Sequence, residues 1–134
     1  MPPRAEIVRE WVRKARNDLE TARRVMVDTN APILDTGCFH CQQTVEKLLK
    51  AFLLWRGVES PKVHTLGVLF DLVRQQDEAF ETIRDACEWL TRFAVQVRYP
   101  HGRDPSPQKA REALAAAETA YEFVLERLPA EVHA

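Results

Sequence analysis

The sequence has little glycine and few cysteines, and each shortage excludes a class of structure. Glycine occurs 4 times in 134 residues and proline 8 times, which favours long helices over a turn-rich all-β fold. Three cysteines, an odd number, argue against a disulfide framework and agree with a reducing compartment. No apolar run approaches the roughly 18 residues of a membrane span, and the opening MPPRAEIVRE contains no signal-peptide hydrophobic region. We therefore expect a cytoplasmic protein.

An excess of one charge is also missing. The chain carries 19 basic and 20 acidic residues, a net charge of -1, which argues against tight non-specific binding of nucleic acid by the isolated chain. A hydrophobic content of 46% with 29% charged residues is typical of a folded globular domain. The length allows one core that buries roughly 68% of the unfolded surface. We expect one domain over residues 1–134, with its core at about 5–128.

Signatures of common catalytic and metal sites are lacking as well. The sequence contains no glycine-rich phosphate loop, Gly-x-Ser-x-Gly, His-Glu-x-x-His or paired-aspartate metal motif. The stretch from Cys38 to Cys41 looks like half of a zinc motif, but structural zinc needs four convergent ligands and no second Cys/His pair has suitable spacing. Both cysteines lie on the apolar seam of a predicted helix, where a small apolar side chain packs well. We expect no metal and no cofactor.

Helical periodicity recurs after each break in the chain. It predicts helices over about Arg4–Met26, from Asp35 or Thr36 to a stop at Gly57, after Thr65, from about Phe80 to Tyr99, and from the Ser106–Pro107 cap to Leu128. The fourth helix is predicted to end by about Tyr99, because the residue before Pro100 is disfavoured in helical geometry. Four long helices with one apolar seam each predict an all-α, antiparallel up-and-down four-helix bundle with one additional short helix.

One carboxylate lies on an apolar stripe. Asp18 falls among the predicted core positions of the first helix, where burial is costly unless the charge is paired. Its candidate partners are Arg98, Lys47 or a helix N-terminus. The pattern favours a structural tie between helices, and the alternative is a polar pocket inside the bundle.

The second helix carries a dense polar face. Gln43, Lys47 and Lys50 share one side, so two ammonium groups and an amide could address one anionic ligand. The alternative is an ordinary solvated face with salt bridges, and the sequence by itself favours that alternative.

The segment between the last two long helices concentrates reactive groups. Arg98, Tyr99, His101 and Arg103 stand within six residues, and these types suit phosphate contact, base stacking and proton transfer. Functional groups often lie on such loops. A tight structural loop would have the same composition, so both interpretations stay open.

Four short motifs in order resemble those of the HEPN domain family. Gln43 to Lys50 reads Gln-x-x-Glu-Lys-x-x-Lys, preceded by Trp11 with the Ala15–Leu19 run and followed by His64-Thr65-Leu66 and Arg98-Tyr99-Pro100. The resemblance covers about residues 5–128. It implies a helical bundle that binds nucleotides, commonly forms a homodimer, and in prokaryotes pairs with a minimal nucleotidyltransferase, in some cases as a toxin–antitoxin system.

Some members of that family are metal-independent ribonucleases with an arginine, four to six residues, and then a histidine. Here only two residues separate Arg98 from His101, and Arg92 stands too far back. We therefore expect a non-catalytic, nucleotide-binding or accessory subunit. Its expected nucleotide- or phosphate-binding residues are Asp18, Gln43, Lys47, Lys50, Arg98 and His101. The alternatives are a ribonuclease toxin, in which Arg98 and His101 are the candidate catalytic residues, and a structural helical dimerisation module.

The homodimer has a second argument from the residues. Two of the predicted helices carry apolar side chains away from their seams, and one bundle core is expected to leave some of them uncovered as an interface. These residues are Phe39, Leu49, Leu53, Leu54, Trp89 and Phe93.

Overall fold

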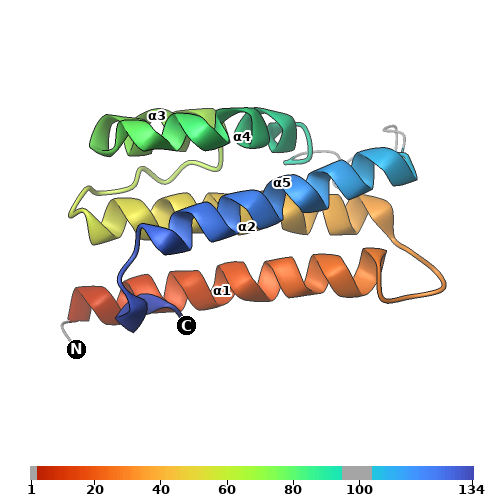
Figure 1. Ribbon diagram of the computed structural model, residues 1–134, viewed down its shortest axis with the longest axis horizontal. Coiled ribbons are helices and arrows are strands. Elements are labelled where there is room, and N and C mark those ends of the chain that lie inside the picture. The colour runs from red at the N-terminus through yellow and green to blue at the C-terminus, as the bar shows by residue number, and fades with distance from the viewer. Residues whose placement is uncertain (1–2, 95–103) are drawn as a thin grey trace.

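The computed structural model describes residues 3–94 and 104–134, and all regular structure in these ranges is helical. The elements are α1 (Pro3–Met26), α2 (Leu34–Trp55), α3 (Leu66–Gln76), the 3-10 helix η1 (Glu78–Ile83), α4 (Arg84–Thr91), α5 (Pro107–Glu126) and the 3-10 helix η3 (Ala130–Val132). Figure 1 shows their arrangement. The predicted all-α fold is confirmed.

Helix α2 is the centre of the molecule. It contacts α1, α3, α4 and α5, whereas α1 touches neither α3 nor α4. In Figure 1 α1 therefore lies on one side of α2, and α3 and α4 lie on the other. A helix surrounded in this way is buried on most of its circumference rather than along one stripe, which becomes important for its polar residues.

Two helix ends lie where the sequence signals predict them. Gly57, at φ 75°, ends α2 in a Schellman motif, because Gly57 N–H donates to the Leu54 carbonyl and Val58 N–H to the Leu53 carbonyl. Ser106 caps α5 as predicted, and its Oγ accepts from the Lys109 N–H at 3.2 Å.

Two other predicted helix starts differ from expectation. Helix α2 begins at Leu34 after Ile33, ahead of the predicted Asp35 or Thr36, and Ile33 makes no side-chain cap. Asp35 instead accepts from the N–H of the next residue at 2.8 Å. Thr65 does precede α3, but it forms no side-chain cap bond.

The predicted fourth long helix is wrong within the described residues. Asp77 caps a 3-10 helix by accepting from the Ala79 N–H at 3.0 Å, and α4 then runs only from Arg84 to Thr91 before a turn. The apolar positions Phe80, Ile83, Cys87 and Leu90 are nevertheless buried as predicted. The 3-10 turn keeps the apolar face toward the core although the helix period is interrupted.

The single chain covers half of the six apolar residues that the sequence places away from the helix seams. Leu49, Leu53 and Phe93 are buried inside the single chain, because α2 is covered on nearly all sides. Only Phe39, Leu54 and Trp89 stay half-buried. The large apolar side chains that are exposed among the described residues come from four separate positions, Ile7, Val27, Ile33 and Val68.

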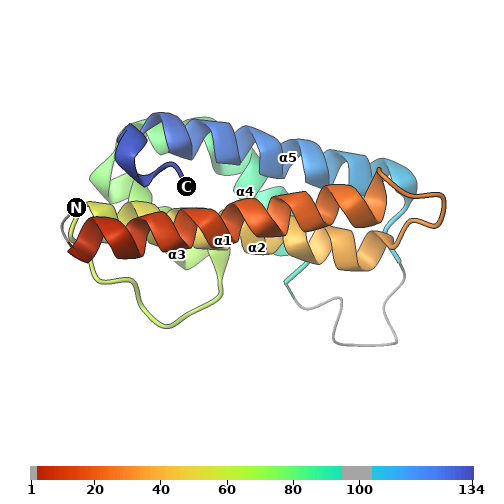
Figure 2. The same cartoon turned by 90° about the horizontal axis from the view of Figure 1, so that it is seen from below.

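The C-terminal segment closes the fold beside α1. η3 packs against α1, and the chain end lies near that helix (Figure 2). Arg16 of α1 donates to the Ala134 carbonyl there. Among the described helices none is both long enough and apolar enough to cross a membrane.

Candidate functional site

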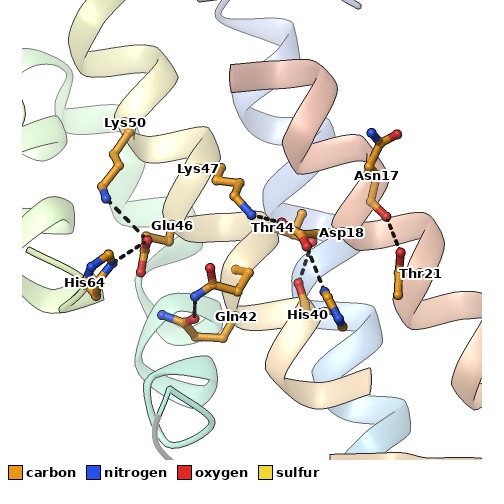
Figure 3. Close-up of polar contacts among 11 residues, drawn as sticks. Asn17, Asp18, Thr21, His40, Gln42, Thr44, Glu46, Lys47, Lys50 and His64 are labelled. Atoms are coloured by element: carbon orange, nitrogen blue, oxygen red, sulfur yellow. Dashed lines mark hydrogen bonds and ion pairs between the residues drawn. The ribbon is translucent and has the colours of Figure 1, made fainter. Parts of the chain in front are cut away.

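Polar side chains meet on the face that α2 shares with α1 and with the loop before α3 (Figure 3). They form two groups, each built around a buried carboxylate. We call Asp18, His40 and Lys47 the Asp18 cluster, and Glu46, Lys50 and His64 the Glu46 cluster.

In the Asp18 cluster both carboxylate oxygens have partners. Oδ1 lies 2.8 Å from His40 Nδ1, and Oδ2 pairs with the Lys47 ammonium. Asp18 is only 8% exposed, so it needs these partners to offset its lost hydration. The predicted tie between helices is thus present, with Lys47 as the predicted partner and His40 as one that the sequence did not indicate.

The pKa of Asp18 reflects this balance. Burial by itself raises the pKa of the carboxyl, but the hydrogen bonds from His40 and Lys47, together with their positive charge, outweigh it. The result is a pKa below the ordinary value of an aspartate. The carboxylate is therefore ionised at neutral pH and holds the Lys47 ammonium in place.

The Glu46 cluster is less completely paired. Glu46 is 3% exposed, and its Oε2 faces both the Lys50 Nζ at 3.3 Å and the His64 Nδ1 at 3.0 Å. Its other oxygen, Oε1, is buried without a partner among the described residues. His64 comes from the loop before α3, and its side chain is 75% exposed. Oε2 of Glu46 thus contacts two nitrogen-bearing side chains, while Oε1 contacts none among the described residues.

The polar face of α2 is largely withdrawn from solvent, contrary to the solvated face that the sequence favours: Lys50 is buried, and Gln43 and Lys47 are half-buried. Gln42, Thr44, Glu46 and Lys50 all lie in the interior, because α1, α3, α4 and α5 surround the helix. Gln43 donates from Nε2 to Gln42 Oε1 at 2.7 Å, and Gln42 Nε2 has no partner in the part of the chain described. Gln43 therefore contacts its neighbour rather than joining either lysine.

A pocket of about 350 Å³ opens beside the Glu46 cluster. After the Schellman turn at Gly57 the chain turns back and runs between α2 and α3 to the start of α3 (Figure 1), and residues of this loop form one wall of the pocket. Helices α1 and α2 form the others. The lining residues are Trp11, Lys50, Leu54, Glu59, Ser60, Pro61, Lys62 and His64.

Trp11 is the main aromatic group of this pocket. The Lys50 Nζ lies 5.7 Å from the centre of its ring, within cation–π range. A second hollow of about 340 Å³ adjoins Trp11 and is lined also by Ile7, Glu10, Lys14 and Lys47. The indole therefore borders two hollows that both contain lysine.

The remaining predicted site residues lie in the segment that the structure does not describe. Arg98 and His101, and with them Tyr99 and the motif at Arg98-Tyr99-Pro100, lie outside the described residues. The described structure brings Asp18 together with Lys47 and places Lys50 in the neighbouring cluster.

The three cysteines behave as core residues. Cys38, Cys41 and Cys87 are free and buried, and burial raises the pKa of Cys38 and of Cys87 to about 12. A thiol of that kind is protonated and unreactive at neutral pH. The predicted packing role is confirmed. Among the described residues, no three His, Cys, Asp or Glu side chains converge as metal ligands would.

Three residues of these clusters were missed as site residues by sequence reasoning. His40 falls on α2, and only its placement in the folded chain separates it from an ordinary surface group. Glu46 is the glutamate of the Gln-x-x-Glu-Lys-x-x-Lys motif, which is its one signal in the sequence. His64 stands on the loop before α3, far from α2 along the chain. Its only signal in the sequence is its place in the His64-Thr65-Leu66 motif.

An all-α chain of this arrangement has known counterparts. The structure is similar to that of TT1696 from Thermus thermophilus, with 28% sequence identity, a TM-score of 0.73, and coverage of 90% of this chain and 98% of that one. It also shares its fold with ST0689, an archaeal HEPN homologue, at 22% identity and a TM-score of 0.65, over 90% of this chain and 96% of that one. A comparison with curated proteins finds no match.

The family follows from the sequence match. The model of the HEPN domain matches residues 8–128, which includes both clusters and the pocket. The chain belongs to the HEPN domain family.

Proposed function

We propose that the chain is a non-catalytic HEPN subunit that binds a nucleotide and pairs with a minimal nucleotidyltransferase. One observation carries the nucleotide part. A half-buried indole, Trp11, stands in a pocket whose rim carries Lys50, Lys62 and His64. A planar aromatic surface beside cationic groups suits a ligand with a ring at one end and phosphate at the other.

The polar clusters support a binding role more than a catalytic one. In the Asp18 cluster the carboxylate, the ammonium and the imidazole are all engaged with one another. A general acid or base needs a proton-transfer position directed at substrate, whereas these groups are used to hold α1 against α2. In a partnership of this kind, the nucleotidyltransferase supplies the chemistry.

The partner and the oligomeric state belong to the same proposal. This chain aligns over nearly the full length of both structures that it matches. The family to which it belongs supports a homodimer that works beside a minimal nucleotidyltransferase, in a complex or a toxin–antitoxin pair. We expect light scattering at micromolar concentration to give the mass of a dimer, and the mass of a single chain would contradict that part.

Two experiments test the rest. Calorimetry with a panel of nucleotides should show saturable binding, and co-expression with a nucleotidyltransferase encoded beside this chain should yield a complex that survives purification. Absence of both results would leave the structural dimerisation module as the better description.

The ribonuclease alternative is tested separately. Purified protein is incubated with tRNA or mRNA in the presence of a metal chelator. We expect no cleavage. Cleavage that Arg98→Ala and His101→Ala both abolish would replace the proposal with an enzymatic function.

A further inference from the structure

The two carboxylate clusters differ in how completely they are paired, and this difference separates a structural site from a ligand site. Asp18 uses both oxygens, one for His40 and one for Lys47. Glu46 contacts both Lys50 and His64 through the same oxygen, Oε2, and the distance from the Lys50 Nζ to this oxygen is long, at 3.3 Å. The Lys50 ammonium, held by Glu46 only at this distance, therefore has N–H donors left for a ligand anion, whereas Lys47 is in close contact with Asp18.

The Glu46 cluster is also the one that reaches a cavity. Lys50 and His64 line the pocket of about 350 Å³, and Lys62 from the loop lines it with them. Lys62 is exposed and has no ion pair among the described residues. Three nitrogen-bearing side chains from two segments thus border one cavity, which is an arrangement that suits a terminal phosphate.

The other walls of the pocket match the remaining parts of a nucleotide. Trp11, Leu54 and Pro61 provide apolar surface for a base, and an indole face is a good stacking platform. Glu59 and Ser60 add a carboxylate and a hydroxyl, and carboxylates commonly accept the hydroxyl protons of a ribose.

We propose that this pocket binds a nucleoside monophosphate, with its base against Trp11 and its phosphate between Lys50, Lys62 and His64. This inference rests on the proposed function and specifies its ligand class and site. In the complex the Lys50 ammonium donates to the phosphate as well as to Glu46, and the His64 ring, whose Nδ1 faces Glu46, contacts the phosphate beside it. Lys47 stays with Asp18 and takes no part.

Size and charge set the ligand class. A volume of about 350 Å³ stands at the lower end of small-molecule sites, which suits one nucleotide rather than two. Lys50 and Lys62 are opposed by Glu46 and Glu59, so the pocket lacks the surplus of positive charge that a triphosphate needs. A single phosphate needs fewer contacts with N–H donors than a triphosphate does, and the two lysines and His64 can supply them.

The test measures binding by calorimetry to the full chain and to four variants. The probes are AMP, adenosine and inorganic phosphate. Lys62→Gln and His64→Gln should each weaken AMP binding by about tenfold, because each removes a charge-assisted contact. Trp11→Leu should weaken adenosine and AMP together. Lys14→Gln is the matched control, since this exposed lysine lines the other hollow beside Trp11, and it should leave the affinity for AMP unchanged.

The outcomes separate this inference from the function on which it rests. If AMP binds with equal affinity to wild type and to Lys62→Gln, or if Lys14→Gln is as damaging, the site assignment is overturned while nucleotide binding stands. If inorganic phosphate binds as tightly as AMP, the base position is overturned. If no nucleotide binds while the nucleotidyltransferase complex still forms, both the site and the nucleotide part of the proposed function fail, but the partner role remains. Circular dichroism of each variant checks that folding is intact.

Discussion

Asp18 shows how a single charged residue can be placed from sequence while its full environment cannot. Its position on an apolar stripe requires a partner, because an unpaired buried carboxylate is costly, and Lys47 is one that helical spacing makes available. His40 and the Glu46 cluster could not be derived in the same way. The burial of Glu46 and Lys50 depends on the other helices that surround α2, and the motifs that contain Glu46, Lys50 and His64 do not indicate that these side chains meet.

At the scale of the residue, the prediction that the cysteines are core residues can be tested by replacing one sulfur atom with oxygen. Cys41 is fully buried, and burial raises the pKa of its thiol. Cys41→Ser places a hydroxyl where few polar partners exist, so we expect the free energy of unfolding to fall by about 1–3 kcal/mol. Urea unfolding measures this change. Cys41→Ala, which introduces no polar group, should cost less, and a larger loss for alanine than for serine would contradict the explanation.

At the scale of elements, α2 and α4 mark the limits of periodicity. The apolar stripe of the α4 region was correctly identified, since Phe80, Ile83, Cys87 and Leu90 are buried. The helix itself is interrupted, because Asp77 caps a 3-10 turn whose inward face still matches the stripe. For α2 the apolar seam was correct and the polar face was misjudged. Periodicity identifies the face that must be buried, but it does not reveal how many neighbours a helix will have.

Helix caps allow a comparison between two elements. Ser106 accepts from the Lys109 N–H at the start of α5, whereas Thr65 occupies the same position before α3 and makes no such bond. Ser106→Ala should therefore lower the free energy of unfolding by about 1 kcal/mol. Thr65→Ala should change it by no more than a few tenths, since no cap bond is lost. Chemical denaturation of both variants checks the contrast, and equal effects would show that the side-chain bond is not the cause.

At the scale of the whole molecule, the fold was more predictable than the site. Four of the five α-helices that the described ranges contain were correctly anticipated from periodicity and turn signals, because burying apolar faces determines an all-α bundle. The site depends on contacts between segments far apart in the chain, such as the loop after Gly57 meeting Trp11. Local sequence does not encode such contacts, so the pocket could be found only in the folded chain.

The Asp18 cluster should make the stability of the whole domain depend on acid. Because the pKa of Asp18 is lower in the folded chain than its ordinary value of 3.8, its stabilisation is present above pH 3.8 and is lost as pH falls through the lowered folded value. The hydrogen bond from Arg84 lowers the pKa of Glu81 to about 2. The exposed ion pair between Glu81 and Arg84 therefore also loses its stabilising effect as pH falls. A variant is therefore needed to isolate Asp18.

Asp18→Asn removes the charge that joins α1 to Lys47 and His40 of α2. At pH 7 we expect it to lower the free energy of unfolding by about 1.5–3 kcal/mol, the range for a hydrogen bond to a charged group. The difference between wild type and variant should shrink as pH falls below 3.8 and through the lowered folded pKa of Asp18, because the wild-type carboxyl then becomes protonated too, while the contribution of Glu81 is common to both proteins and cancels. Urea unfolding at neutral pH and at a series of acidic values that extends as low as the folded protein persists measures the difference. If it stays constant across that range, the role of Asp18 is packing rather than charge, and the ionic tie between α1 and α2 is contradicted.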